Sequence, residues 1–414
     1  MTLATELSVL CASFVLLKVA AAYAGPAGFG EFVVARRLIG WIQLPTLAGM
    51  ALGLTRSVAM TRARGQGEGE WAYLDAALLV AGTTTTVVVL ALLCFSPVVA
   101  QLGMGDRELA GLARAMAPGV AGLVLHAVAY GLLRGRRSMV SANALQAINL
   151  GMIPLLAFAI PGLDIARLVL VTGAGQACIA VLVLIAIRRA GPAREPWRAI
   201  WQAPARELLR YGVPRIPGEF ILGALTALPV TAAAHYGGSV AAGQIGLGQS
   251  VLTLLGALFA PLGQVMLPSI SARVASGEVR GVERSIWLLV AACLGLTFLG
   301  VIAIYLLAPW LIPFIFGAAF SGAVGPIRIM VLGAVPYVAY VVLRNVLDAI
   351  HAAPLNAANL AVALLVFGAA LGVGRSLEAV PVAAVASMIA LGLLTAWRAH
   401  RALRDVATAA ASAA

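Results

Sequence analysis

The stretch Tyr23–Phe32 reads YAGPAGFGEF, and an altered copy at Tyr236–Ile245 reads YGGSVAAGQI. Each copy has a tyrosine, two glycines and an acidic or amide residue in the same order, directly before a long apolar run. A second pair, Leu133–Arg134 and Leu343–Arg344, is separated by nearly the same number of residues. These echoes predict that the fold is a duplicated unit, with one copy in each half of the chain.

Apolar residues dominate the sequence on both sides of the repeated stretch. Of 414 residues, 62% belong to the hydrophobic set and only 11% are charged. A soluble domain carries about 25% charged residues. Because a soluble protein of this length has no interior large enough for so much apolar surface, the composition predicts a polytopic membrane protein.

A membrane-spanning helix needs about 20 apolar residues, and twelve runs approach or exceed this length. The runs are 3–24, 30–54, 72–95, 110–133, 139–160, 165–187, 212–235, 241–270, 286–308, 324–343, 354–373 and 379–397. We therefore expect an all-α membrane protein with twelve transmembrane helices. An even number of spans per repeat gives two parallel six-helix lobes, and such repeats place a substrate path around a central cavity between them.

The longest polar connection lies in the middle of the chain and divides it. The expected parts are an N-terminal six-helix lobe at 1–187, a cytoplasmic linker at 188–211, a C-terminal six-helix lobe at 212–397 and a cytoplasmic tail at 398–414. Tryptophans and arginines interleave in the linker, which is typical of a short helix on the inner membrane surface.

Basic residues outnumber acidic ones by 28 to 16, giving a net charge of +12. Most arginines gather in the connections on one side of the predicted topology, whereas the other side has only Arg107, Arg167, Arg328 and Arg375. Such clusters mark cytoplasmic loops beside anionic lipid head groups. We expect a multi-pass protein of the bacterial inner membrane with both termini cytoplasmic, with membrane lipids and no nucleic acid among its partners.

Five short motifs occur in a familiar order. They are Tyr23–Gly30, the SP…LG segment Ser96–Gly103, Leu133–Arg136, Tyr211–Pro214 and the APWLIPFIFG segment Ala308–Gly317. In this order and spacing they resemble the Wzx-like oligosaccharide and O-antigen flippases. That family belongs to the multidrug, oligosaccharidyl-lipid and polysaccharide (MOP) exporter superfamily, and the resemblance covers essentially the whole chain.

The resemblance implies a function. Flippases of this family move an undecaprenyl-diphosphate-linked oligosaccharide across the inner membrane for polysaccharide and lipopolysaccharide synthesis, by alternating access. They work beside polysaccharide polymerase and export proteins, and H⁺ or Na⁺ is the expected coupling ion. Two alternatives stay open: a MATE-type antiporter for cationic drugs or other small molecules, and a non-transporting scaffold of a polysaccharide-export machine.

Charged residues within the apolar runs are the candidate site, because a charge inside a membrane is costly unless it faces a cavity or a partner. Arg36, Arg37, Lys18 and Arg215 are the expected contacts for the diphosphate or glycan. Arginine suits a diphosphate because its guanidinium donates bidentate hydrogen bonds and stays charged when desolvated. The alternative is that these side chains extend to the head groups or pair with neighbouring helices.

Acidic residues near the ends of the runs supply candidate gates or ion pairs. Arg215 and Glu219 are four residues apart, as are Arg344 and Asp348, so each pair fits one helix face. Glu31 follows the first repeated glycines. Structural ion pairs at the ends of helices are the alternative to a gating function.

His126 and His351 are candidates for a proton-linked step, because histidine titrates near neutral pH. Packing or solvent exposure is the alternative for both.

The sequence has no HExxH, no Walker motif and no compact nucleophile constellation, so we expect no enzyme, metal or cofactor. Cysteines occur only within apolar runs and without paired spacing, which disfavours disulfides. They are Cys11, Cys94, Cys178 and Cys293.

Overall fold

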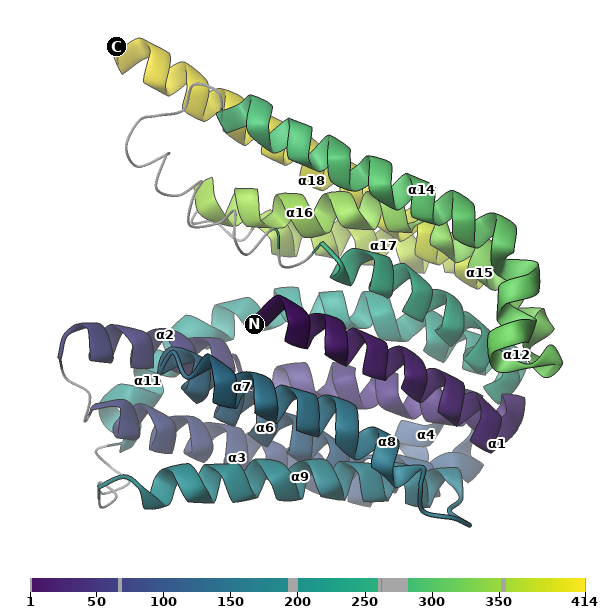
Figure 1. The fold of residues 1–414 in the computed structure, drawn as a ribbon, viewed down its shortest axis with the longest axis horizontal. Coiled ribbons are helices and arrows are strands. Elements are labelled where there is room, and N and C mark those ends of the chain that lie inside the picture. The colour runs from purple at the N-terminus through teal and green to yellow at the C-terminus, as the bar shows by residue number, and fades with distance from the viewer. Residues whose placement is uncertain are drawn as a thin grey trace. The chain divides into compact units, whose positions relative to one another are not determined.

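The structure is a computed structural model that describes residues 2–65, 69–192, 200–259, 262, 282–350 and 355–413. All regular secondary structure in these residues is helical (Figure 1). The chain divides into two compact units. Unit 1 comprises Met1–Gly223 with Gly238–Val240, and unit 2 comprises Ala224–Gly237 with Ala241–Ala414.

The first half of the chain supplies the helices of unit 1. They are α1 (Thr2–Thr46), α2 (Met50–Ala63), α3 (Glu70–Cys94), α4 (Ser96–Met104), η2 (Arg107–Leu109), α5 (Ala110–Ala115), α6 (Ala117–Gly135), α7 (Met139–Gln146), η3 (Ala147–Met152), α8 (Ile153–Ala157), α9 (Ile165–Arg189), η4 (Trp201–Ala205), α11 (Arg206–Gly212) and η5 (Val213–Arg215). Helix α12 (Ile216–Ala257) then continues into unit 2.

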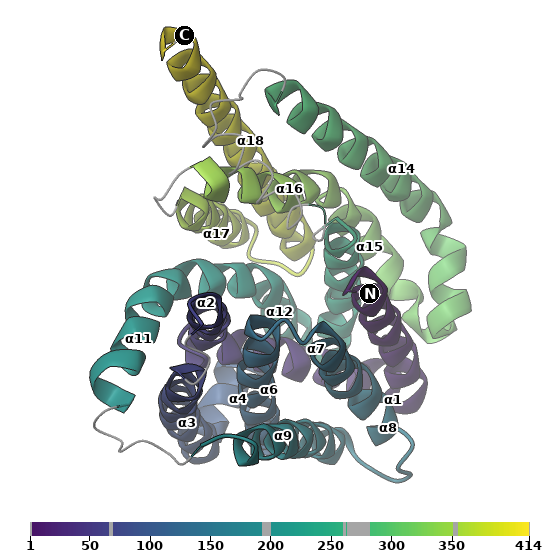
Figure 2. The same ribbon diagram turned by 60° about the vertical axis from the view of Figure 1, so that its left-hand side comes forward.

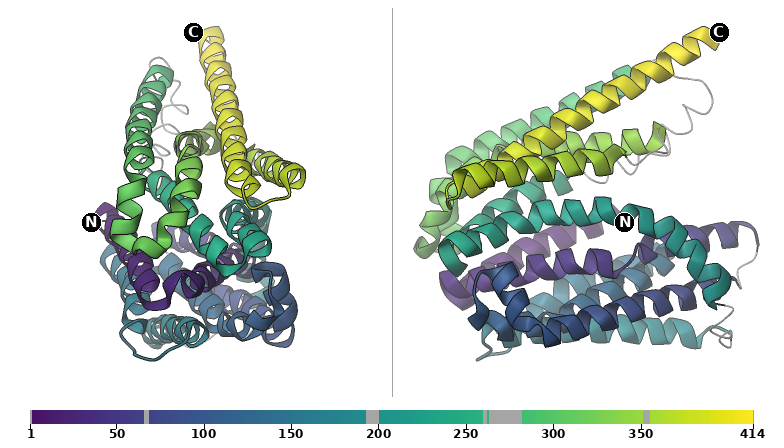
Figure 3. Two further views of the ribbon diagram at one scale, coloured as in Figure 1. Left: turned by 90° about the vertical axis from the view of Figure 1, so that its right-hand side faces the viewer. Right: turned by 180° about the vertical axis from the view of Figure 1, so that it is seen from behind.

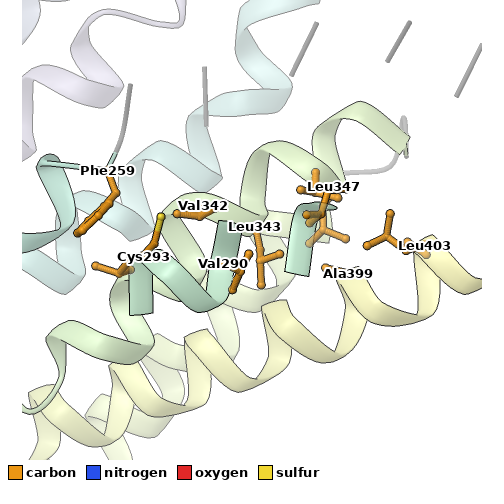
Figure 4. Packing of buried hydrophobic residues seen from close by; sticks show 12 residues of the cluster. Phe259, Val290, Cys293, Val342, Leu343, Leu347, Ala399 and Leu403 are labelled. Carbon is orange, nitrogen blue, oxygen red and sulfur yellow. The ribbon is translucent and has the colours of Figure 1, made fainter. Parts of the chain in front are cut away.

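The remaining helices belong to unit 2. They are α14 (Val282–Phe316), η6 (Ala318–Ala323), α15 (Val324–Val331), α16 (Ala334–Ile350), α17 (Leu355–Gly374) and α18 (Ala379–Ala413). Figure 3 shows α17 and α18 running side by side. Buried residues of α14, α16 and α18 form an apolar core that includes Val290, Cys293, Leu343 and Leu403 (Figure 4).

Nine helices of the described residues are long and apolar enough to cross a membrane. A bent pair, Ala318–Val331 and Ala334–Asp348, raises this number to ten if it is one span interrupted by a 49° bend. The prediction of a multi-pass, all-helical membrane protein is therefore confirmed.

Two of the nine apolar helices contain a glycine in a conformation that interrupts helical geometry. Gly25 has φ 64° and ψ −177°, and Gly238 has φ 70° and ψ −167°. Only glycine adopts this region readily. The two residues occupy the same position in the stretches Tyr23–Phe32 and Tyr236–Ile245, so the sequence repeat is also a repeat of backbone conformation.

The expected uninterrupted run 30–54 is broken in the structure. Helix α1 ends at Thr46, and a turn containing Ala48 (φ 49°) and Gly49 (φ 71°) separates it from α2. A Cβ atom on Gly49 would lie 2.4 Å from the Cα atom of Gly212, so α2 and α11 approach each other at two glycines. This contact holds α11, which begins within the predicted linker at 188–211, against α2.

Helix α6 lies at the centre of unit 1. It packs against α9 and α3, and Figures 1 and 2 show the three helices side by side. Gly119 of α6 and Gly173 of α9 allow the closest approach, because a Cβ atom on Gly173 would lie 2.4 Å from the Gly119 nitrogen. The tight packing fixes the positions of the polar residues that α9 supplies to the candidate site.

Candidate functional site

Arg36 lies in a cavity of about 240 Å³ inside unit 1, which we call the Arg36 cavity. The helix that follows Gly25 ends at Thr46, so Arg36 is near the middle of this helix. Its Nη2 donates a hydrogen bond to Ser13 Oγ at 3.3 Å. The Arg36 side chain is otherwise exposed and has room to contact a ligand.

The Arg36 cavity has polar groups on one wall and no acid among its lining residues. Ser13, Thr172 and Gln176 line it together with Arg36, and its other lining residues are apolar or glycine. A cationic cavity without a carboxylate favours an anion over a cation, because a nearby opposite charge stabilises the bound group. This is the chemistry expected of a phosphate site.

A π-helical segment supplies further polar atoms beside the cavity. Gln176 Nε2 donates to the carbonyl oxygen of Asn149 at 3.0 Å, within η3. Pro154 follows η3 and has no N–H to donate to the Leu150 carbonyl, which accounts for the irregular turn. Such π-helical turns frequently occur at functional sites.

Asn149 is completely buried, and neither atom of its amide group has a hydrogen-bond partner in the structure. The Thr172 hydroxyl is also buried without a partner. Buried polar groups are nearly always hydrogen-bonded, so the Thr172 hydroxyl, which lines the Arg36 cavity, is a candidate contact for a polar group of a ligand, whereas Asn149 is not among the lining residues. The sequence indicates Asn149 only as one of several polar residues within a run.

The other basic residues predicted for the site do not line the Arg36 cavity. Arg37 is half-buried and engaged in interactions of its own, and Lys18 is exposed on the first part of α1. Glu31 is half-buried on the helix that carries Arg36, one turn and a half before it. Adjacent residues on a helix point about 100° apart, which explains why Arg36 and Arg37 separate.

Arg215 and Glu219 do not form the expected ion pair among the described residues. Arg215 Nη1 instead donates to the Tyr211 carbonyl oxygen at 2.6 Å, and its guanidinium lies over the Tyr211 ring, 3.8 Å from the centroid. Pro214 begins a 3₁₀ turn at η5, which directs the arginine back toward Tyr211. The prediction of an Arg215–Glu219 ion pair was wrong. A turn distorted by proline does not keep residues that are four apart in sequence on the same helix face.

In unit 2, Arg344 and Asp348 share one cluster. Asn356 Nδ2 donates to the Arg344 carbonyl oxygen at 3.0 Å and to Asp348 Oδ1 at 2.7 Å. The amide thereby joins the end of α16 to the start of α17. His351 lies outside the described residues.

His126 is buried in α6 and stacks on Tyr130, with 5.8 Å between the ring centroids. Its Nδ1 atom has no hydrogen-bond partner in the structure. It does not line the Arg36 cavity, so the two features are separate. In the described part of the chain, no group of three or more histidine, cysteine or acidic residues is arranged to hold a metal ion.

A buried charge network was missed by the sequence analysis. Glu70 is 3% exposed and pairs with Arg62 at 2.6 Å and with Arg136 at 2.8 Å. Asp75 accepts two hydrogen bonds from Arg188, at 3.0 and 3.1 Å. The network joins the ends of α2, α3, α6 and α9. Its signal in the sequence is that two acids lie at the start of one apolar run and that arginines lie at the ends of three other runs.

The fold and the cavity define a class of membrane protein. The fold is that of the MATE transporters of the MOP superfamily. An inward-facing multidrug resistance MATE transporter of this superfamily matches with a TM-score of 0.81 at 14% identity, over 98% of this chain and 99% of that chain. An outward-facing form matches with a TM-score of 0.66 at 14% identity, over 97% and 94%. The Vibrio cholerae MATE transporter VcmN in its bent form matches with a TM-score of 0.59 at 15% identity, over 97% and 95%.

The family follows from the sequence comparison. The chain belongs to the polysaccharide biosynthesis protein family, whose model matches residues 2–274. This confirms the family resemblance found in the sequence. A search of curated proteins finds no match. The solved structures named above are of transporters.

Proposed function

We propose that the protein is a flippase that moves an undecaprenyl-diphosphate-linked oligosaccharide across the bacterial inner membrane for polysaccharide or lipopolysaccharide synthesis. The family and the transporter fold support this proposal. The observation that carries it is the Arg36 cavity, which places one guanidinium in the middle of an apolar helix with no acid in the cavity lining. A charge at that depth costs about 3 kcal/mol or more, so it needs a compensating partner such as a diphosphate.

The proposed architecture has twelve spans in two six-helix lobes that alternate in access. Nine apolar helices become twelve if the helices interrupted at Gly25 and Gly238 each count as two spans and the bent pair counts as one more. Each lobe would then contain one copy of the repeat. The N-terminal lobe would hold the diphosphate at Arg36.

The arginine-rich end of unit 1 gives the orientation. Arg62, Arg136 and Arg188 meet there through Glu70 and Asp75. Positively charged ends of membrane helices face the cytoplasm. We therefore place this end, and both termini, on the cytoplasmic side. Lys18 and Arg37 are proposed as secondary substrate contacts and Glu31 as part of a gate or ion pair, with His126 and H⁺ or Na⁺ as candidates for coupling.

A MATE-type antiporter is the second candidate function. The fold favours it, because the solved neighbours are MATE transporters. A cationic drug bound beside Arg36 would need an acid there, and the described residues that line the Arg36 cavity include none. The chemistry of the site therefore favours an anionic substrate. A scaffold that transports nothing would not need a cavity beside Arg36.

Complementation of a flippase-deficient strain tests the proposal. We expect this chain to restore surface polysaccharide in at least one host from a panel with different sugar repeats, while drug resistance of an efflux-deficient strain stays unchanged. Rescue of drug resistance without any polysaccharide would overturn the flippase proposal in favour of the antiporter.

A further inference from the structure

A second hollow of unit 1 lies on the other side of the helix that carries Arg36. It has a volume of about 420 Å³ and is lined by residues of α1, α3 and the first turns of α12, including Trp41, Pro45, Val87, Val88 and Phe220. We call it the apolar groove. Its volume lies in the range of about 300–1,000 Å³ that is typical of ligand pockets.

Aromatic residues form one wall of the apolar groove. The rings of Trp41 and Phe220 stack with 5.0 Å between their centroids, and Trp41 Nε1 donates to the Phe220 carbonyl oxygen at 3.1 Å. The tryptophan N–H is therefore satisfied and presents no donor to a ligand. Val87, on the facing helix, is 62% exposed.

The three threonines of the apolar groove do not make it polar. Thr46 Oγ1 donates to the Ile42 carbonyl oxygen at 2.7 Å, and Thr83 Oγ1 donates to that of Leu79 at 2.7 Å. Thr84 Oγ1 donates to the Thr46 carbonyl oxygen at 2.6 Å. Because each hydroxyl is bonded to the backbone, the threonines expose mainly their methyl groups. The groove suits a hydrocarbon chain.

Two guanidinium groups from different elements, Arg56 of α2 and Arg215 of η5, meet near the start of the helix that carries Phe220. Arg56 and Arg215 both lie over the ring of Tyr211, at 4.7 and 3.8 Å from its centroid. We call these three residues the arginine clamp. Both arginines are exposed, and in the described part of the chain neither forms an ion pair. Both positive charges therefore lie within 5 Å of one ring centroid and are open to an anion.

The arginine clamp and the apolar groove are neighbours along the chain. Arg215 precedes Phe220 by five residues, about 7.5 Å along a helix at 1.5 Å per residue. The clamp joins α2 to α11 and η5, and α12, which follows η5 directly, contributes Phe220 to the groove. This order, with charge at the end and apolar surface within, matches an amphiphile with an anionic head group and a long apolar chain.

We propose that the arginine clamp and the apolar groove dock a polyprenyl diphosphate, with the diphosphate contacting Arg56 and Arg215 and part of the prenyl chain against Trp41 and Phe220. The inference rests on the proposed function and deepens it. It adds a loading site at the arginine-rich end that precedes transfer of the head group to Arg36. Trp41 and Arg36 are five residues apart on one helix, so the two sites lie on neighbouring turns.

Direct binding of undecaprenyl diphosphate without any sugar tests this site, because binding needs no transport. Purified full-length protein in nanodiscs would be titrated with this lipid and with phosphatidylglycerol as the competing membrane lipid. We expect Val87→Trp, which fills the groove, to weaken binding of undecaprenyl diphosphate at least tenfold. Leu90→Trp is the matched control, because Leu90 is 54% exposed on the same helix but does not line the groove, and we expect less than a twofold change.

The head-group half of the site has its own variants. We expect Arg56→Gln and Arg215→Gln each to weaken binding about tenfold, whereas Arg210→Gln, an exposed arginine of α11 outside the clamp, has little effect. If the added tryptophan prevents folding of V87W, Phe220→Ala removes one wall without adding volume. Its control is Phe314→Ala, at an 87% exposed position of unit 2.

Two results would overturn the docking site. One is unchanged binding in Val87→Trp and Phe220→Ala, and the other is equal displacement of the probe by phosphatidylglycerol, which would indicate a general lipid site. The flippase proposal can fail separately from the docking site. If the variants weaken binding of undecaprenyl diphosphate as expected but the wild-type chain complements no host, the docking site is kept and flipping is rejected.

Discussion

Asn149 is the residue whose burial is hardest to explain by folding alone. Its amide is completely buried without a partner, whereas Asn359, in the equivalent Asn-Leu position of the second repeat, donates to Thr395 Oγ1 at 3.1 Å. An unsatisfied buried amide costs about 1–3 kcal/mol. Asn149 does not line the Arg36 cavity, but Gln176, which does, donates to the Asn149 carbonyl oxygen, so we expect Asn149 to act on the cavity through Gln176.

Substitution of Asn149 by leucine separates stability from function. Because the change removes an unsatisfied polar group at similar volume, we expect the Tm of the purified protein to rise by a few degrees while polysaccharide export falls at least tenfold. Asn359→Leu loses a hydrogen bond and should lower the Tm. A lower Tm with unchanged export for Asn149→Leu would contradict this assignment.

At the scale of elements, Gly25 and Gly238 interrupt two long helices at the same point of the repeat. Space does not limit either position, because a Cβ atom would meet nothing within 4 Å. The cost of Gly25→Ala or Gly238→Ala is therefore conformational, about 1–3 kcal/mol. We expect each variant to lower the Tm and the yield of folded protein in membranes.

Gly82→Ala provides the control for these two variants, because Gly82 has ordinary helical geometry and equal free space. Alanine is the better helix former by about 1 kcal/mol, so this change should be neutral or stabilising. Equal behaviour of all three variants would show that the two interruptions are not required.

The buried charge network connects four helix ends through two acids. Glu70→Ala leaves Arg136, whose side chain is 15% exposed, without its carboxylate. Removing one partner of a buried pair destabilises by about 3–5 kcal/mol. We expect a marked fall in Tm, whereas Glu283→Ala, which removes a half-exposed contact with His400 at 3.7 Å, should change it little. A Tm for Glu70→Ala equal to that of the control would show that the network contributes no stability.

The helices themselves were largely predictable from the sequence, because a long apolar segment that crosses a membrane has few alternatives to a helix. The positions where the helices are interrupted were less predictable. The break between Thr46 and Met50 depends on the contact of Gly49 with Gly212, which lies far along the sequence. The pair Arg215–Glu219 failed for a local reason, since Pro214 starts a 3₁₀ turn. Arg36 was predictable as an intramembrane charge, whereas Asn149, Thr172 and the network at Glu70 required the packing of α3, α6 and α9.

For the whole molecule, the proposed twelve-span topology makes a prediction about the two termini. An even number of spans would put both ends on one side, and the arginine clusters predict that this side is the cytoplasm. Green fluorescent protein, which folds in the cytoplasm, should fluoresce when fused after Arg404. Alkaline phosphatase should be active when inserted at Gly162, in the turn before α9. A C-terminal fusion that is expressed at normal levels but does not fluoresce would contradict the cytoplasmic placement of the C-terminus.

The family and the class of fold were also within reach of the sequence, because five motifs in order carry more information than any one of them. The substrate could not be predicted from the sequence, because the chemistry of a cavity depends on which of several intramembrane charges faces it. Of the four basic residues predicted for the substrate, only Arg36 lines a described cavity. Arg215 lies over Tyr211 beside Arg56, a partner that the sequence pattern did not indicate.

The central claim is that Arg36 contacts the anionic part of a lipid-linked glycan. The most direct measurement is polysaccharide export in a complemented flippase-deficient strain that expresses wild type, Arg36→Ala, Arg36→Lys or Arg375→Ala at equal membrane levels. We predict at least a tenfold loss for Arg36→Ala, partial activity for Arg36→Lys, and full activity for Arg375→Ala, whose side chain donates to the Gly372 carbonyl oxygen at the surface. Wild-type export by Arg36→Ala would contradict the claim.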